Sequence, residues 1–214
     1  MAKADFIKQV MQVMNEAGWN NDSFSGSDVT MIEEHIEAVF VDAWRKATKA
    51  LPKTYFTIND FSGNKLSGDT STGTGYIILP DDFYTLYSFK MEGWQKAVET
   101  LYPSSDSMAA IQANEYTRGS AVRPVCIMSK KYIKKASTSG EIKEAIEYYS
   151  LPKGKQHKVA EALYIPLMKP LSDDTVIDQK LITPLAYLCA GLVYNIFEKP
   201  DIAALLERTA LEIN

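Results

Sequence analysis

The stretch GYIILPDDFYTLYSF, residues 75–89, decides how the middle of the chain folds. It contains two short runs of β-branched and aromatic residues, which are typical of strands. Pro80, Asp81 and Asp82 separate the runs, and aspartates after a proline readily form a turn by bonding to nearby backbone N–H groups. Neighbouring side chains on a strand point to opposite faces, so these two carboxylates would not converge on one substrate. The stretch therefore predicts a strand, a corner and a second strand, and not a catalytic acid pair.

Strand-like patterns continue on both sides of this corner. Before it, YFTIND at residues 55–60 alternates, and residues 61–75 are rich in glycine and serine and favour turns. Residues 104–120 lack alternation and predict a short helix within a long loop. Further strand candidates are RPVCIMS, EAIEYYSLP and KVAEALYIPLM, at residues 123–129, 144–152 and 158–168. The middle of the chain is therefore predicted to be rich in β-structure.

Both ends of the chain have helical periodicity instead. Apolar residues recur at helical spacing in two segments of the first fifty residues, and Pro52 ends the second segment. Near the C-terminus, residues 181–197 (LITPLAYLCAGLVYNIF) predict a helix with Thr183 as its N-cap and Pro184 as its first residue. This segment is shorter than the roughly 18–20 apolar residues of a membrane span, so a buried helix is predicted. A short amphipathic helix is predicted for residues 202–213.

The order of elements is helices, then strands, then helices, which predicts an α+β fold. The expected domains are residues 1–52 and 173–214, packed together as one helical bundle, and residues 53–172 as a β-rich insert. The helix at residues 181–197 is apolar on nearly all sides, so the N-terminal helices, a partner subunit or both must cover it. The candidate residues for contact with a partner subunit are Tyr187, Ala190, Gly191 and Tyr194.

The composition is that of an ordinary globular protein. Of the 214 residues 46% are apolar and 23% are charged, and the net charge is −4. Cys126 and Cys189 are far apart and neither has a CxxC neighbour, so no disulfide framework or zinc site is predicted and a reducing compartment fits. The N-terminus has no uninterrupted apolar segment of the kind found in signal peptides, so synthesis in the cytoplasm is expected.

Motifs for catalysis or cofactor binding are weak. GDTSTGTG at residues 68–75 lacks the GK[ST] ending of a phosphate-binding loop and precedes a strand, whereas such a loop must open a helix. His35 and His157 have neither a nucleophile nor a second ligand at metal-binding spacing. Glu33 and Glu37 share a helix face, for which a solvated surface is favoured over a catalytic carboxylate pair. No catalytic residue, metal or cofactor is therefore predicted.

Positive charge is concentrated between residues 121 and 158. This segment carries nine Lys or Arg residues against three Glu, a net charge of +6, so the rest of the chain carries −10. Such a segment is an electrostatic footprint for polyanions, although a solvated loop has the same composition. No sequence-reading motif accompanies it, so contact with nucleic acid is expected to be non-specific and salt-dependent. The predicted nucleic-acid-binding residues are Lys130, Lys131, Lys134, Lys135, Lys153, Lys155 and Lys158.

Two parts of the sequence resemble a family of viral structural proteins. YIILPDDFYTL at residues 76–86, followed by Trp94, resembles the LP-x-D-F-x-x-L motif of head-to-tail adaptor proteins in short-tailed bacteriophages. Residues 161–210 resemble the end of the same proteins, where a Y-x-P strand and an acidic turn precede a proline-started helix and a final short helix. The first fifty residues match by helix pattern alone. The family is the tail tubular protein A and packaged-DNA-stabilising adaptor group, which includes ring proteins of crAss-like phages.

The resemblance implies a non-enzymatic virion protein with a helical bundle and a β-rich insert. Such adaptors assemble as rings, usually of twelve copies, beneath the portal protein at the head-to-tail junction, where they also contact tail or further adaptor proteins. They help to retain packaged double-stranded DNA, and the predicted lysines would suit the ring lumen because they contact phosphates without reading bases. No membrane contact is implied. The chain departs from the family in its long glycine- and serine-rich hairpin and its lysine-rich insert.

Two other classes of function remain as alternatives. The first is a phage-associated hydrolase of cell-wall glycans, which needs two carboxylates about 5–10 Å apart in a cleft, with Glu33 and Glu37 as the candidates. The second is a monomeric host module that binds anionic ligands through residues 130–158. Self-assembly into a ring distinguishes the adaptor from both alternatives.

Overall fold

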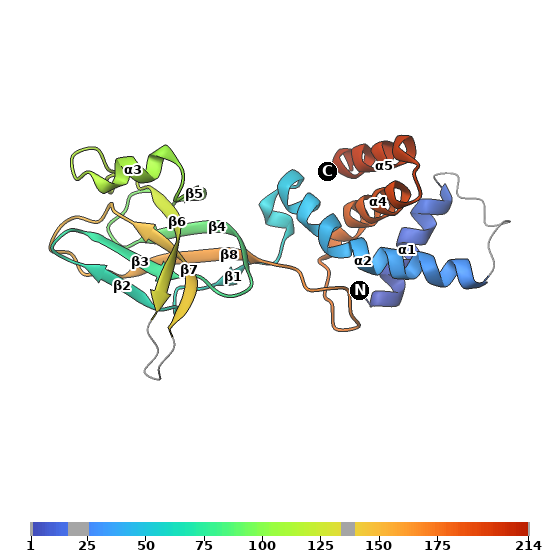
Figure 1. The fold of residues 1–214 in the computed structure, drawn as a ribbon, viewed down its shortest axis with the longest axis horizontal. Helices are drawn as coiled ribbons and strands as arrows, with labels where there is room; N and C mark the ends of the chain where they lie inside the picture. Colours follow the sequence, from blue (N-terminus) through green and yellow to red (C-terminus); the bar gives the residue numbers. More distant parts are fainter. Residues whose placement is uncertain (1, 17–25, 134–139, 214) are drawn as a thin grey trace. The chain divides into compact units, whose positions relative to one another are not determined.

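The computed structural model describes residues 2–16, 26–133 and 140–213, which divide into two compact units (Figure 1). The helical unit consists of Met1–Thr57 and Met168–Asn214, and the β unit consists of Ile58–Leu167. The fold is therefore α+β, as predicted, with the β unit inserted between the two halves of the helical unit. The boundaries expected from the sequence, after residues 52 and 172, lie a few residues away from these.

The described part of the helical unit contains four α-helices. They are α1 (Lys3–Glu16), α2 (Gly26–Ala50), α4 (Gln179–Ile196) and α5 (Pro200–Glu212), with a 3₁₀ turn at Lys53–Tyr55. Helix α4 packs against each of the other three helices. Phe6 of α1 meets Phe40 of α2 edge to face, with ring centroids 5.5 Å apart, and both side chains are fully buried. The apolar residues of the two chain ends therefore form one shared core, which local periodicity alone could only suggest.

Helix α4 begins earlier than the sequence pattern predicts. Asp178 is its N-cap, and the Asp178 carboxylate accepts a hydrogen bond of 3.0 Å from the backbone N–H of Lys180. The prediction of Thr183 as N-cap is therefore wrong, and Pro184 lies inside the helix. Because proline has no N–H, Pro184 leaves one carbonyl of the first turn without its helical partner. The added turn buries Leu181, whose side chain is 2% exposed, and this burial favours the longer helix.

Within its described residues, the β unit contains two sheets and one short helix. One sheet has the order β1–β8–β4, and the other has the order β2–β3–β7–β6–β5, with only the β5–β6 pair parallel. The predicted helix within residues 104–120 is confirmed as α3 (Ser107–Ala113). The strands are β1 (Asn59–Asp60), β2 (Leu66–Asp69), β3 (Thr74–Ile78), β4 (Phe83–Met91), β5 (Tyr102–Pro103), β6 (Cys126–Ile133), β7 (Glu141–Tyr148) and β8 (Val159–Pro166).

Both sheets contribute side chains to one aromatic-rich core. Phe89 of β4 stacks on Phe61, with centroids 6.2 Å apart, and meets Trp94 edge to face at 5.7 Å. Ile146 and Tyr148 of β7 join this cluster from the second sheet, and both are fully buried. Packing of side chains from both sheets against one another explains why two small sheets are stable in one unit of this size.

The corner predicted at Asp81 and Asp82 is confirmed. These residues form the turn between β3 and β4, and their carboxylates engage different strands. Asp81 pairs with Lys143 of β7 at 2.6 Å, whereas Asp82 accepts a hydrogen bond of 2.8 Å from the Tyr164 hydroxyl of β8. The two aspartates thus hold the corner against both sheets and do not form a joint acid pair.

Candidate functional site

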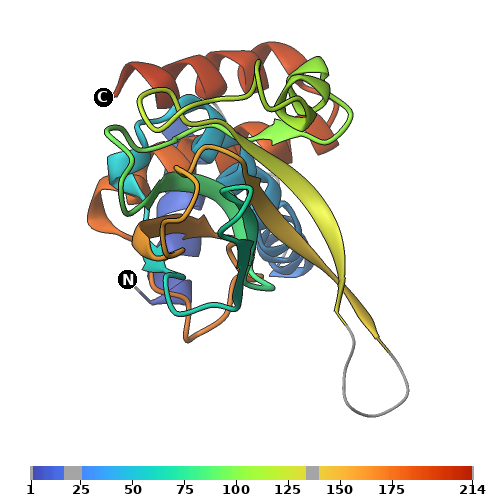
Figure 2. The ribbon, with the colours of Figure 1, turned by 90° about the vertical axis from the view of Figure 1, so that its left-hand side faces the viewer.

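The most prominent surface feature of the β unit is the β6–β7 hairpin. Its strands pair along their full length, from Cys126 opposite Tyr148 to Ile133 opposite Glu141. Figure 2 shows the hairpin, in yellow and gold, extending away from the rest of the β unit. The neighbouring strand β5 pairs with β6 only as far as Met128, and β3 pairs with β7 only from Ala145 onward. A backbone hydrogen bond of 2.9 Å from the Leu79 N–H to the Glu144 carbonyl oxygen continues the contact by one residue. Farther out, no other described strand pairs with either edge of the hairpin, which is a two-stranded ribbon there.

One face of this ribbon carries exposed apolar side chains. At its inner end the face packs Cys126, Ile146 and Tyr148 into the core. Farther out the same face carries Tyr132 and Ile142, which lie directly opposite each other and are 62% and 67% exposed. Exposed side chains of this size placed next to each other are typical of a contact surface for another protein. We call the outer residues Lys130, Tyr132, Ile142 and Glu144 the hairpin face.

Gly140 lies close to the tyrosine of the hairpin face. Its backbone N–H donates a hydrogen bond of 3.1 Å to the Tyr132 hydroxyl oxygen. A Cβ atom on Gly140 would overlap the Tyr132 ring, so only glycine permits this close approach. The ring is thereby tied to the start of β7 while most of its surface stays exposed to solvent.

The opposite face of the ribbon is covered by paired charges. The Lys131 ammonium nitrogen lies 2.8 Å from a Glu147 carboxylate oxygen and 5.4 Å from the centre of the Tyr76 ring. The Lys143 ammonium nitrogen lies 2.6 Å from an Asp81 carboxylate oxygen and 3.2 Å from a Glu141 carboxylate oxygen. Hydrogen bonds from Lys143 to these two carboxylates raise the pKa of its ammonium group above the usual 10.5. This face is therefore close to charge-balanced.

The predicted lysines do not form a single patch. Lys130 and Lys131 lie on β6 near the end of the hairpin, whereas Lys153, Lys155 and Lys158 follow the other end of β7. Lys130 lies opposite Glu144, four residues before β7 ends at Tyr148, so about 13 Å of strand separates it from the connection that carries the second group. The lysines of one continuous segment are thus divided into two groups by about half the length of β7. Lys134 and Lys135 lie outside the described residues.

Several of the predicted lysines are engaged by acidic residues. Lys153 pairs with Glu115, and Lys158 pairs with Glu92 at 2.6 Å. Within the described residues Lys130 and Lys155 form no ion pair, and both are exposed. Nucleic-acid binding by the lysines stays a prediction, and Lys130 and Lys155 have the most freely available charges for it.

The predicted subunit interface on α4 is wrong for three of its four residues. Ala190 and Tyr194 have no exposed surface, and the Tyr194 hydroxyl donates a hydrogen bond of 2.8 Å to the Met14 carbonyl oxygen of α1. Gly191 is buried against α5, where an added Cβ would lie only 3.2 Å from the Ala203 carbonyl oxygen. The chain's own helices cover these residues, so they are unavailable to a neighbouring subunit. Tyr187 is partly exposed, and its role stays a prediction.

Three of the other polar candidates from the sequence, Glu37, His35 and His157, have structural partners. Glu37 pairs with Lys3 at 2.7 Å, and with Glu33 it lines a surface hollow of about 280 Å³. The ring of His35 meets Phe197 edge to face, and His157 Nδ1 shares a hydrogen bond of 2.7 Å with the Tyr148 hydroxyl.

The two cysteines are free and fully buried, one in each unit, and burial raises the pKa of both thiols. Across the described residues no three His, Cys, Asp or Glu side chains are grouped as metal ligands.

The hairpin face was missed in the sequence, where only the lysines of this segment drew attention. The signal that could have found it is the alternation in Lys130–Ile133 and Glu141–Glu144, which places Tyr132 and Ile142 on the same side of their strands.

None of the described helices is long and apolar enough to cross a membrane. No protein-family model matches this chain, and no curated protein sequence matches it.

Proposed function

We propose that this protein is a structural subunit of a ring between the portal and the tail of a short-tailed bacteriophage, without enzymatic activity. The observation that carries the proposal is the architecture, in which both ends of the chain form one helical unit and the middle forms an inserted β unit. This is the arrangement that the resemblance to head-to-tail adaptors implies. In the ring the chain would contact copies of itself, the portal protein and further tail or adaptor proteins.

Exposed apolar side chains on both units support the proposal that this chain binds neighbouring proteins. On the β unit they include Tyr132 and Ile142 of the hairpin face. On the helical unit they include Leu205 and Leu211 of α5 and Ile213 just after it. Subunits of a closed ring bury two different surfaces against two neighbours, so each copy must carry more than one contact surface.

The proposed contact with DNA is electrostatic. Lys130 and Lys155 are exposed and unpaired within the described residues, and DNA carries a dense array of phosphate charges that binds such ammonium groups. Contacts of this kind do not depend on base sequence, which suits a ring through which any part of a genome passes. Most other predicted lysines must exchange a carboxylate partner for a phosphate, so their contribution is expected to be smaller.

Native mass spectrometry of the purified chain, alone and mixed with candidate portal proteins, tests the proposal. We expect a closed multi-copy ring when the matching portal protein is present. Assembled particles in which Lys130 and Lys155 are replaced by glutamine should retain DNA less well at raised salt. A chain that stays monomeric with every portal protein offered would contradict the ring, and unchanged DNA retention would exclude the two lysines.

A further inference from the structure

A hollow of about 300 Å³ lies at the end of the β unit that is opposite the hairpin face. Its walls are residues 118–121, which precede β6, and residues 149–153, which follow β7. Arg118 and Lys153 contribute positive charge, and Ser120 and Ser150 contribute hydroxyl groups. No carboxylate belongs to the described lining. We call this feature the basic hollow.

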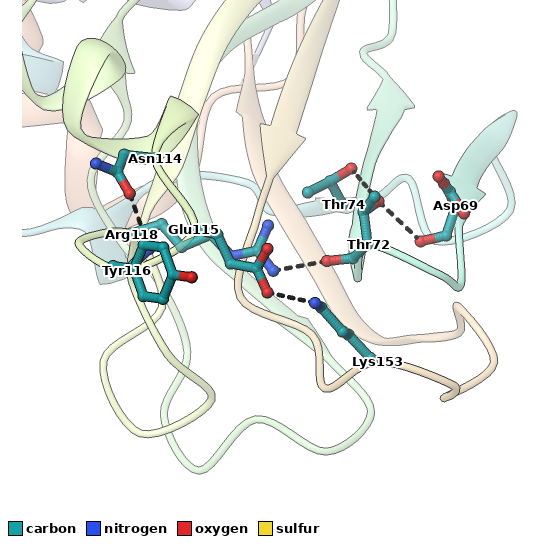
Figure 3. A network of polar contacts seen from close by, with 8 residues as sticks. All are labelled: Asp69, Thr72, Thr74, Asn114, Glu115, Tyr116, Arg118 and Lys153. Carbon is teal, nitrogen blue, oxygen red and sulfur yellow. Dashed lines mark hydrogen bonds and ion pairs between the residues drawn. The ribbon is translucent and has the colours of Figure 1, made fainter.

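Both walls of the basic hollow are attached to the turn between β2 and β3. The Arg118 guanidinium donates a hydrogen bond of 2.7 Å from Nη2 to the Thr72 carbonyl oxygen, as Figure 3 shows. On the other wall, the backbone N–H of Leu151 donates to the Gly73 carbonyl oxygen at 3.2 Å. The Asp69 carboxylate holds the turn itself by accepting from the Ser71 N–H at 2.8 Å. The charged groups are thus presented on a preorganised frame, which reduces the entropic cost of binding a ligand.

The polar groups of the basic hollow offer more donors than acceptors. Ser150 is 4% exposed, and its hydroxyl oxygen accepts a hydrogen bond of 3.4 Å from the Val125 N–H. The Ser120 hydroxyl oxygen accepts at 3.3 Å from the Arg123 N–H. Neither hydroxyl donates to an acceptor in the described residues, and Arg118 uses only one of its five N–H donors in a described hydrogen bond. A matching ligand must therefore supply several acceptor atoms and negative charge.

We propose that the basic hollow binds a phosphate group. Arg118 and Lys153 neutralise its charge, and the hydroxyls of Ser120 and Ser150 donate to its oxygens. Charge-assisted hydrogen bonds of this type are about twice as strong as neutral ones, and arginine matches the geometry of phosphate oxygens. The site goes beyond the proposed ring, because binding of a phosphate requires no neighbouring subunit.

Glu115 lies beside the basic hollow and competes with the ligand. Its carboxylate pairs with the Lys153 ammonium group, as Figure 3 shows. The hydrogen bond from Lys153 lowers the pKa of Glu115 below its usual 4.5, so Glu115 is charged at neutral pH. A bound phosphate must therefore draw Lys153 away from Glu115. Replacing Glu115 by glutamine removes the competitor and should strengthen phosphate binding.

Isothermal titration calorimetry of the full chain with inorganic phosphate, in a buffer free of other oxyanions, tests the site. Arg118→Gln should weaken binding by at least about tenfold, because a charged hydrogen-bond donor is lost. Glu115→Gln should tighten binding about two- to fivefold. Lys65→Gln is the matched control, since Lys65 is an exposed lysine of the same unit that lies outside the lining and has no proposed binding role, and it should bind as the wild type does.

Lys153→Gln is a second test in case Arg118→Gln does not fold. This substitution removes a positive charge from the basic hollow but keeps the hydrogen bond from Arg118 to Thr72. Circular dichroism establishes that each variant is folded. A second titration with a short DNA duplex distinguishes the source of the phosphate group. Saturable binding of inorganic phosphate identifies a free phosphate or phosphate ester as the ligand. Saturable binding of the duplex alone, weakened in Arg118→Gln and in Lys153→Gln, identifies the DNA backbone as the ligand. The proposal is overturned if the wild type binds neither inorganic phosphate nor the duplex. It is also overturned if Arg118→Gln and Lys153→Gln bind as tightly as the wild type.

Discussion

At the scale of single residues, Gly73 shows how closely two segments of the β unit approach each other. Its backbone has a φ of 71°, in the left-handed region that favours glycine. An added Cβ would also overlap the Leu151 carbonyl oxygen, while the Gly73 carbonyl accepts a hydrogen bond of 3.2 Å from Leu151. Gly73 thus combines two requirements for glycine, conformation and space. Gly154, with a φ of 78° and nothing within 4 Å of the added Cβ, has only the first.

This contrast predicts different costs for two alanine substitutions. Gly154→Ala should lower the free energy of unfolding by about 1–2 kcal/mol, the cost of left-handed backbone for a residue with a Cβ. Gly73→Ala should lower it by about 3 kcal/mol or more, because the backbone of Leu151 must also move. Urea unfolding of both variants checks the difference. Equal costs would show that the connection after β7 relaxes freely around residue 73.

Tyr194 links the C-terminal part of the helical unit to α1 through one buried hydrogen bond. Its hydroxyl donates to the Met14 carbonyl oxygen, which belongs to the last turn of α1 and so has no helical donor within the bounds of that helix. Tyr194→Phe should lower the free energy of unfolding by about 1–3 kcal/mol, because a buried acceptor is left unsatisfied. Thermal or urea unfolding measures the change. Tyr187→Phe on the same helix is the control and should stay within about 0.5 kcal/mol of the wild type.

At the scale of elements, the β6–β7 hairpin is divided into a structural half and an exposed half. The inner half packs Cys126, Ile146 and Tyr148 into the core, and the outer half carries the hairpin face. Side chains of the same strand face therefore differ in what they stabilise, according to how far along the strand they lie. Ile146 contributes to folding, whereas Tyr132 and Ile142 are available for contact with another molecule.

A double substitution of the hairpin face separates assembly from folding. Tyr132→Ser combined with Ile142→Ser should change the free energy of unfolding by no more than about 1 kcal/mol, the value of one cross-strand pair. The same variant should lose ring formation with the portal protein, as measured by native mass spectrometry. Ile146→Ala provides the contrast, because it should cost about 2–5 kcal/mol of stability. A double variant that assembles like the wild type would show that the hairpin face contacts no neighbour.

At the scale of the whole molecule, the chain passes from the helical unit to the β unit and back. The two crossings lie at residues 57–58 and 167–168, and they are close in space because β1 pairs with β8. Each unit has its own buried apolar residues, so neither depends on the other for a hydrophobic core. This arrangement suits a protein whose two units bind different neighbours.

The β unit should therefore fold when it is produced alone. A fragment of residues 58–167 contains the complete aromatic core, including Trp94, which is 4% exposed. We expect a monomer with the circular dichroism of β-structure and a cooperative loss of the buried fluorescence of Trp94 on heating. Trp94 is the only tryptophan of the fragment, so the signal has one source. An unfolded fragment would show that the helical unit is required for its folding.

The sequence by itself determined the features that depend on neighbouring residues along the chain. The α+β class follows from the change between helical and strand periodicity near residues 54 and 170, and the corner at Asp81 and Asp82 follows from local turn chemistry. The short helix α3 lies within a segment that lacks strand alternation. These features were predictable because hydrogen bonding and side-chain direction over a few residues decide them.

Only the tertiary structure decided which of these residues meet. The faces of α4 that α1, α2 and α5 cover were hidden in the sequence because a helix that is apolar on all sides does not indicate which neighbour covers each side. The lysines are divided into two groups because the inner half of the β6–β7 hairpin separates them. The basic hollow forms because β6 and β7 bring residues 118–121 and 149–153 to the same end of their sheet. Register and packing between distant segments determine these contacts, and local periodicity does not predict them.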